Sequence, residues 1–137
     1  MKLTKNLSVL KKISLGAAVF WAVIILYFCL KKISELPEIK IAYIDKYIHA
    51  FFYFVFSVLW FYALRFYLKT QKRTNLLGIV FMMSLLFGSA IELFQTYFTT
   101  YRCGDLTDVI ANTAGSLLAL IAICLLDKND FLSKIEI

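Results

Sequence analysis

The sequence predicts an all-α integral membrane protein, a single domain of residues 1–137 built as a bundle of four transmembrane helices. Hydrophobic residues make up 61% of the 137 residues, well above the roughly 50% that is usual in soluble proteins. A globule this small could not bury so much apolar surface, because small domains leave much of their surface exposed. The charged residues stand between long apolar runs, which is the pattern of helices that cross a bilayer.

The first apolar run covers residues 13–30, 18 residues without a charged side chain. A helix of that length is roughly 27 Å long, just enough to cross the hydrocarbon core. The basic residues before the run are typical of a secretory signal peptide, but the run ends in Lys31 and Lys32 without a cleavage site of small residues. We therefore expect an uncleaved first helix.

Three further apolar runs complete the predicted bundle. Residues 47–64 are rich in phenylalanine and end before Arg65. Residues 76–98 carry one charge, Glu92, near their end, and residues 109–126 carry none. No repeat, low-complexity tract or linker separates these runs, so one domain is expected.

The distribution of Lys and Arg predicts the orientation of the chain. The two termini and the second loop together hold ten of these residues, and the other two loops hold five. Because basic loops remain in the cytoplasm, both termini are predicted to be cytoplasmic. The net charge of +6 fits helix flanks at a membrane surface. Nucleic-acid binding is not expected, since the basic residues form no stripe interleaved with aromatic residues.

The polar residues at or near membrane depth gather at one end of the predicted bundle, the extracytoplasmic end. In the second helix, Asp45, His49 and Tyr53 follow one another at intervals of four residues and share one face. The third helix ends and the fourth begins at this same end. The candidate site residues are Asp45, Lys46, His49, Tyr53, Glu92, Gln95, Arg102, Asp105, Asp108 and Asn112.

Glu92 is the most informative of these residues, because an uncharged run, residues 76–91, precedes it. An ionised side chain within a span costs about 2.5–3.5 kcal/mol and normally faces the bundle interior or an aqueous cavity. Arg102 is the expected partner of Glu92 or of one of the aspartates. Two interpretations stay open: a site that binds a ligand, and an ion-paired clasp that holds the helices together and binds nothing.

His49 is the only histidine in the chain. It could ligate a metal, act as a general base, donate a hydrogen bond to a carboxylate, or pack at the membrane interface. Zinc sites usually combine several His or Cys ligands, so no metal and no other cofactor is expected. Asp45, one turn earlier, could orient the imidazole of a base. His49 and Glu92 are the candidate catalytic residues, although no convincing nucleophile accompanies them.

Two other features concern contacts between helices. Small residues at positions 88–90 and 111–116 permit close approach of neighbouring helices. Cys29 and Cys103 are both expected near the outer end, which makes a disulfide between them conceivable, but a sequence cannot show that two residues are close.

Several of the polar residues form a joint pattern. Residues 45–53 contain D-K-x-x-H-x-x-x-Y, and residues 92–95 contain E-x-x-Q. Residues 102–108 contain R-x-G-D-x-x-D, and residues 112–115 contain N-x-x-G. Together these motifs resemble the VanZ-like family of small bacterial membrane proteins, whose named member is associated with teicoplanin resistance. The resemblance covers about residues 33–126.

The resemblance departs from the family pattern at Thr99-Thr100-Tyr101, where a turn with proline or glycine is expected before the arginine. It implies a protein of the bacterial cytoplasmic, or inner, membrane that is linked to the cell envelope. It does not imply a settled chemical mechanism.

A binding protein is the leading functional interpretation, and an enzyme is not favoured. Arg102 and Lys46 would meet the anionic group of a lipid head group or lipoglycopeptide, while the carboxylates would position them or accept ligand donors. The alternative is an enzyme that acts on a lipid-linked envelope substrate with His49 or Glu92 as general base. A small transporter subunit ranks third. The lipid bilayer is the expected partner, and the oligomeric state is left open.

Overall fold

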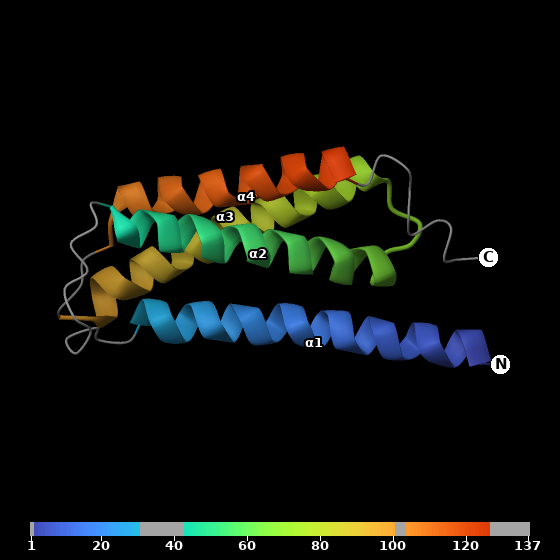
Figure 1. The fold of residues 1–137 in the computed structure, drawn as a ribbon. Coiled ribbons are helices and arrows are strands. Elements are labelled where there is room, and N and C mark those ends of the chain that lie inside the picture. Colours follow the sequence, from blue (N-terminus) through green and yellow to red (C-terminus); the bar gives the residue numbers. More distant parts are fainter. Residues whose placement is uncertain (1, 31–42, 101–103, 127–137) are drawn as a thin grey trace.

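The computed structural model describes residues 2–30, 43–100 and 104–126, and these residues are arranged as four helices. They are α1 (Lys2–Leu30), α2 (Ile44–Tyr67), α3 (Arg73–Phe98) and α4 (Leu106–Leu126), which lie side by side in an elongated bundle (Figure 1). All four are long and apolar enough to cross a membrane. The prediction of an all-α bundle with four membrane spans is confirmed.

Each helix is longer than the apolar run that predicted it. α1 begins at Lys2 rather than near residue 13, and the other three helices begin three residues before the predicted positions. The apolar runs mark the part of each helix that can lie in hydrocarbon. The added residues include charged and polar ones, which end the apolar runs but do not interrupt the helices.

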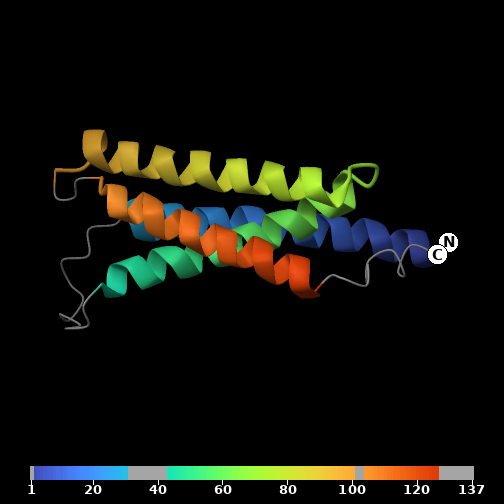
Figure 2. The same cartoon turned by 90° about the horizontal axis from the view of Figure 1, so that it is seen from above.

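Successive helices alternate in direction, so α2 and α4 run parallel to each other (Figure 1). We call the end of the bundle where α2 and α4 begin the polar end, and the other the opposite end. α2 packs against all three other helices, whereas α1 contacts α2 and α3 but not α4 within the described residues. Seen from above, α2 and α4 cross (Figure 2).

Two glycines allow the helices to approach closely. A Cβ atom on Gly115 of α4 would lie 2.0 Å from the carbonyl oxygen of Ala50 in α2, so a larger residue cannot fit at this contact without a shift of backbone. A Cβ atom on Gly88 of α3 would lie 3.1 Å from the amide nitrogen of Asn112 and 3.2 Å from the hydroxyl oxygen of Tyr53. The prediction that small residues permit close helix approach is confirmed at both positions.

Apolar side chains fill two clusters inside the bundle and also cover its outside. Exposed side chains such as Phe20, Leu86 and Leu118 suit a surface that faces lipid rather than water. The first internal cluster comprises Ile25, Cys29, Tyr53, Phe56 and Ile91, and the second, which we call the distal apolar cluster, comprises Phe61, Leu76, Val80 and Ile123. The distal apolar cluster lies toward the opposite end of the bundle.

Candidate functional site

Lys46 is held by three carboxylates at the polar end of the bundle. Its ammonium nitrogen, Nζ, lies 3.0 Å from Oδ2 of Asp45 and 2.8 Å from Oδ2 of Asp105. It also donates a hydrogen bond to Oδ1 of Asp108, so three donors meet three acceptors. The side chain of Asp108 is 4% exposed, whereas those of Asp45 and Asp105 are about half exposed. Lys46 thereby ties the first turn of α2 to the start of α4.

Asp105 also caps α4. Its Oδ1 accepts a hydrogen bond of 2.8 Å from the backbone N–H of Thr107, which satisfies one of the free amides at the start of the helix. Hydrogen bonds from Lys46 and then from Thr107 hold the pKa of Asp105 well below its ordinary value. Asp105 is therefore ionised throughout the physiological pH range.

Glu92 joins the last turns of α3 to the start of α4. Its Oε2 accepts a hydrogen bond of 2.9 Å from the backbone N–H of Asp105. The backbone N–H of Gly104 donates a second bond, of 3.0 Å, to Oγ1 of Thr96. A Cβ atom on Gly104 would lie 2.5 Å from both Oγ1 of Thr96 and the carbonyl oxygen of Glu92. Only glycine therefore lets the chain pass this close to α3.

His49 of α2 is buried between two residues of α4. Its Nδ1 lies 3.0 Å from the amide oxygen Oδ1 of Asn112, and because that oxygen can only accept, Nδ1 carries the hydrogen. Its Nε2 lies 3.7 Å from Oδ2 of Asp108. Asp45 was expected to orient this imidazole, but its carboxylate contacts Lys46 instead. The structure places Asn112 and Asp108 beside the ring.

Three potential metal ligands come together next to Lys46. One ligand atom from each of His49, Glu92 and Asp108 lies within 4.8 Å of the other two, and the three side chains come from three different helices. All three residues are buried. We call this set the buried trio.

The polar contacts continue from the buried trio toward the middle of the bundle. Tyr53 is fully buried, and its hydroxyl, like the amide nitrogen of Asn112, lies close to Gly88. The next polar side chains are three buried serines, one from each of α2, α3 and α4. Their hydroxyl groups form hydrogen bonds between Ser57 and Ser116, at 2.9 Å, and between Ser84 and Ser116.

The three serines are not among the candidate site residues, although the sequence contains a pattern that points to two of them. The spacing of four residues that relates Asp45, His49 and Tyr53 continues to Ser57. The same spacing leads from Asn112 to Ser116. Ser116 also belongs to the run of small residues that was expected to permit close helix approach, and serine often serves packing within membrane helices.

One of the predicted site residues, Gln95, does not take part in this cluster. Gln95 points to α1, where its Nε2 donates a hydrogen bond of 2.7 Å to the carbonyl oxygen of Cys29. Arg102 lies outside the described residues, and so does its expected ion pair. The conceivable disulfide between Cys29 and Cys103 is also outside, because Cys103 is not described.

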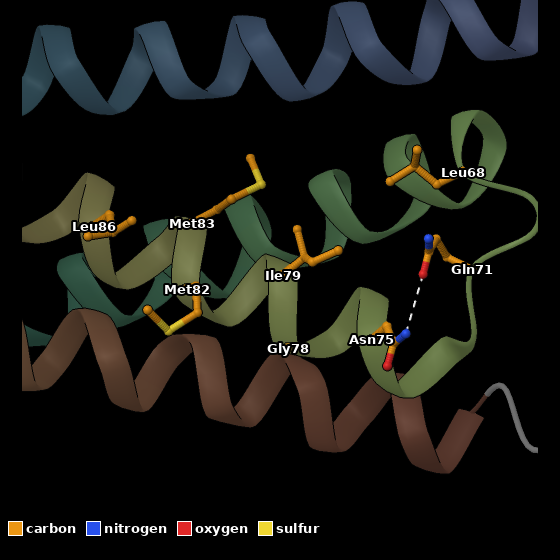
Figure 3. A pocket seen from close by; sticks show the side chains of 8 residues that line it. All are labelled: Leu68, Gln71, Asn75, Gly78, Ile79, Met82, Met83 and Leu86. Atoms are coloured by element: carbon orange, nitrogen blue, oxygen red, sulfur yellow. Dashed lines mark hydrogen bonds between the residues drawn. The ribbon is translucent and has the colours of Figure 1, made fainter.

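A groove of about 610 Å³ lies near the opposite end, along α3 and the turn that precedes it. Figure 3 shows Met82, Met83 and Leu86 along it and a hydrogen bond between Gln71 and Asn75 at one end, which measures 3.3 Å. None of its lining residues is titratable. The groove suits apolar chains of the surrounding bilayer, whereas the ionisable groups gather at the polar end.

The fold and the cluster define a class: a small multi-pass membrane protein with a buried polar site at one end of a four-helix bundle. The chain matches the VanZ/LLP1 family over residues 6–127, which is most of its length, and it belongs to that family. The resemblance drawn from the sequence motifs is confirmed. No curated protein matches the chain, and no solved structure matches it.

Proposed function

We propose that this chain is a binding protein of the bacterial cytoplasmic membrane that holds an envelope-related ligand at its polar end. The ligand is a lipid head group or a lipoglycopeptide, and binding it contributes to resistance against teicoplanin. With both termini in the cytoplasm, as the Lys and Arg distribution favours, the polar end opens to the outside. Envelope precursors and glycopeptide antibiotics meet the membrane on that side.

The observation that carries this proposal is the convergence of ionisable side chains from three helices at membrane depth. Glu92 and Asp108 are 6% and 3% exposed, and ionisable side chains in a membrane span are costly to bury. An interface that served only to hold helices together would be at least as stable with apolar residues of similar size. Ionisable groups in such a place are expected to act on a ligand or a proton.

The contacts assign different tasks to the members of the cluster. From the buried side, Asp108 holds Lys46 and Glu92 holds the start of α4. Asp45 and Asp105 hold Lys46 from the half-exposed side, so an anionic ligand group would reach the ammonium by replacing one of these two. Arg102, three residues before Asp105, would supply the second cation for the same anionic group.

Growth inhibition by teicoplanin tests the proposal in a susceptible host. The comparison uses an empty vector, the wild-type chain, Glu92→Gln and Arg102→Ala, all at matched membrane levels. Asn75→Ala, in the groove at the opposite end, is the matched control. We expect the wild type and the control to protect, and the two site variants to lose protection. An absence of protection by the wild type would contradict the resistance part of the proposal.

The binding part is tested separately. The wild type and both site variants would be purified from bacterial membranes, and the lipids retained by each would be measured by mass spectrometry. We expect one class of envelope lipid that the wild type and Asn75→Ala retain and that both site variants lose. Identical lipid profiles for all four proteins would contradict ligand binding at the polar end.

An enzyme that acts on a lipid-linked substrate is the second candidate, and the surroundings of His49 favour it. A fixed hydrogen on Nδ1 leaves Nε2 to accept a proton, and the carboxylate of Asp108 faces that atom. Glu92 is the weaker candidate for a base because its Oε2 already accepts the amide of Asp105. A lipid species that disappears when the chain is expressed, but persists with His49→Gln at equal abundance, would establish turnover.

A further inference from the structure

We infer that the buried trio of His49, Glu92 and Asp108 is a binding site for one divalent transition-metal ion. The sequence alone gave no reason to expect a metal, because the chain has one histidine and its acidic residues are far apart in sequence. The fold brings the three ligands together from α2, α3 and α4. One imidazole and two carboxylates suit Zn²⁺ and Mn²⁺.

The distances within the buried trio are close to those of a metal site. Two ligand atoms that each lie about 2.1 Å from one ion are about 3.4 Å apart in a tetrahedral site. Nε2 of His49 and Oδ2 of Asp108 are 3.7 Å apart, and one ligand atom of Glu92 lies within 4.8 Å of one ligand atom of each of the other two residues. Binding an ion would draw the two carboxylates inward by the remaining difference.

The hydrogen bond to Asn112 prepares His49 as a ligand. Histidine ligands usually donate their second ring N–H to an oxygen, which fixes both the ring and its protonation. The bond of 3.0 Å between Nδ1 and the amide oxygen of Asn112 is of this kind. It directs Nε2 toward a carboxylate oxygen of Asp108, 3.7 Å away. An ion bound between these two atoms would take one ligand from α2 and one from α4.

The immediate surroundings include a polar group that could serve a water on the ion. Tyr53 is fully buried, and its hydroxyl has no hydrogen-bond partner among the described residues. This hydroxyl and the amide nitrogen of Asn112 both lie close to Gly88, and Asn112 bonds His49. Three protein ligands leave at least one coordination position open to water or to a further ligand. This inference does not depend on the proposed envelope ligand, because the ion would bind with or without it.

Metal binding by the full-length chain tests the inference. The protein would be purified in detergent without a histidine tag, stripped with a chelator, and dialysed against Zn²⁺, Mn²⁺ or Co²⁺ alone. Metal per chain would be measured by mass spectrometry. We expect one ion per wild-type chain and at least about tenfold weaker binding by His49→Gln and Glu92→Gln, in line with the effect of disturbing a metal site.

Asn75→Ala is the matched control, since it lies in the groove at the opposite end and leaves the polar end unchanged. It should retain the ion with wild-type affinity. Nitrogen coupling in the electron paramagnetic resonance spectrum of bound Mn²⁺ or Co²⁺ gives a readout on the wild type alone, because His49 is the only histidine. This readout decides the matter if the variants do not fold. The inference is overturned if the wild type binds no stoichiometric ion or if its bound ion shows no imidazole coupling. It is also overturned if the control loses as much affinity for the ion as the variants of the buried trio.

Discussion

The two sides of α2 are held by different kinds of contact. On the α4 side, backbones meet at Gly115 and Ala50, and charged side chains such as Lys46 and Asp108 bridge the helices. On the α1 side, the contact is mainly aromatic and apolar. Trp21 packs edge-on against Phe52, with ring centroids 5.9 Å apart. The comparison indicates that α2, α3 and α4 carry the site, while α1 stabilises them from outside.

The largest effect is expected where α2 and α4 touch. Gly115→Ala places a Cβ atom 2.0 Å from the carbonyl oxygen of Ala50, so the backbones must separate. We expect it to lower the free energy of unfolding by about 3 kcal/mol or more. Thermal unfolding in detergent, followed by size-exclusion chromatography, measures the loss.

Gly78→Ala is the matched control, because nothing lies within 4 Å of a Cβ atom at that position in α3. It should stabilise the chain by about 0.5–1 kcal/mol, since alanine is the better helix former. If both variants behaved alike, the close contact between α2 and α4 would not be essential to the fold.

A smaller loss is expected from the ion pairs of the same interface. Asp108→Asn removes the charge of a buried side chain that bonds Lys46 and faces His49, and we expect it to cost about 1.5–3 kcal/mol, the usual worth of a hydrogen bond to a charged group. Asp45→Asn removes a half-exposed contact to the same ammonium and should cost less than about 1 kcal/mol. Chemical or thermal unfolding of the two variants gives the comparison. Equal costs would mean that burial does not set the strength of these contacts.

Substitutions on the α1 side of α2 are expected to lower the stability less and to leave lipid retention at the polar end unchanged. Trp21→Phe removes a hydrogen bond of 3.0 Å from the indole nitrogen to the carbonyl oxygen of Phe52, which should cost about 1 kcal/mol. Trp60→Phe is the control, because the indole nitrogen of Trp60 has no hydrogen-bond partner among the described residues. Unfolding temperatures of both variants, with lipid retention as the site readout, test this. Lost lipid retention in Trp21→Phe would give α1 a direct part in the site.

The smallest expected effect is on the stability of the fold at acidic pH. The pKa of Asp105 is lowered in the folded chain, chiefly by the hydrogen bond from Lys46. A lowered folded-state pKa contributes stability at pH values above the ordinary value of 3.8, and this contribution is lost as the pH falls below it. Asp105→Asn, which still caps α4, should flatten the pH dependence of the unfolding temperature between about pH 5 and pH 2. An unchanged slope would show that Lys46 does not hold Asp105 in solution.

The helices and much of the cluster were predictable for a physical reason. A membrane span must be apolar over its whole length, so the spans stand out in the sequence. A regular helix also places residues four apart on one face, which is why His49 was correctly expected to lie on the same face as Asp45 and Tyr53. That this face of α2 meets Asp108 and Asn112 of α4 follows from the close contact of the two helices at Gly115. This contact depends on packing between segments that are far apart in the sequence.

Other details depended on contacts that spacing does not encode. Gln95 is only three residues from Glu92, yet the difference in direction is enough for it to bond α1 instead. Asp105 lies four residues before the predicted fourth span, and its role as the cap of α4 depends on the close approach of the chain to α3 at Gly104. The buried trio needed three helices to be placed relative to one another. The ligand of the polar end stays a prediction.

The distal apolar cluster has a consequence for the permeability of the membrane. From Lys46 to Ser57 the polar contacts extend over about 16 Å of helix, roughly half the thickness of a bilayer core. Beyond the serines, Phe61, Leu76, Val80 and Ile123 close the interior with buried apolar side chains. A polar site can therefore lie deep in the bundle without opening a path for protons or ions through the described interior.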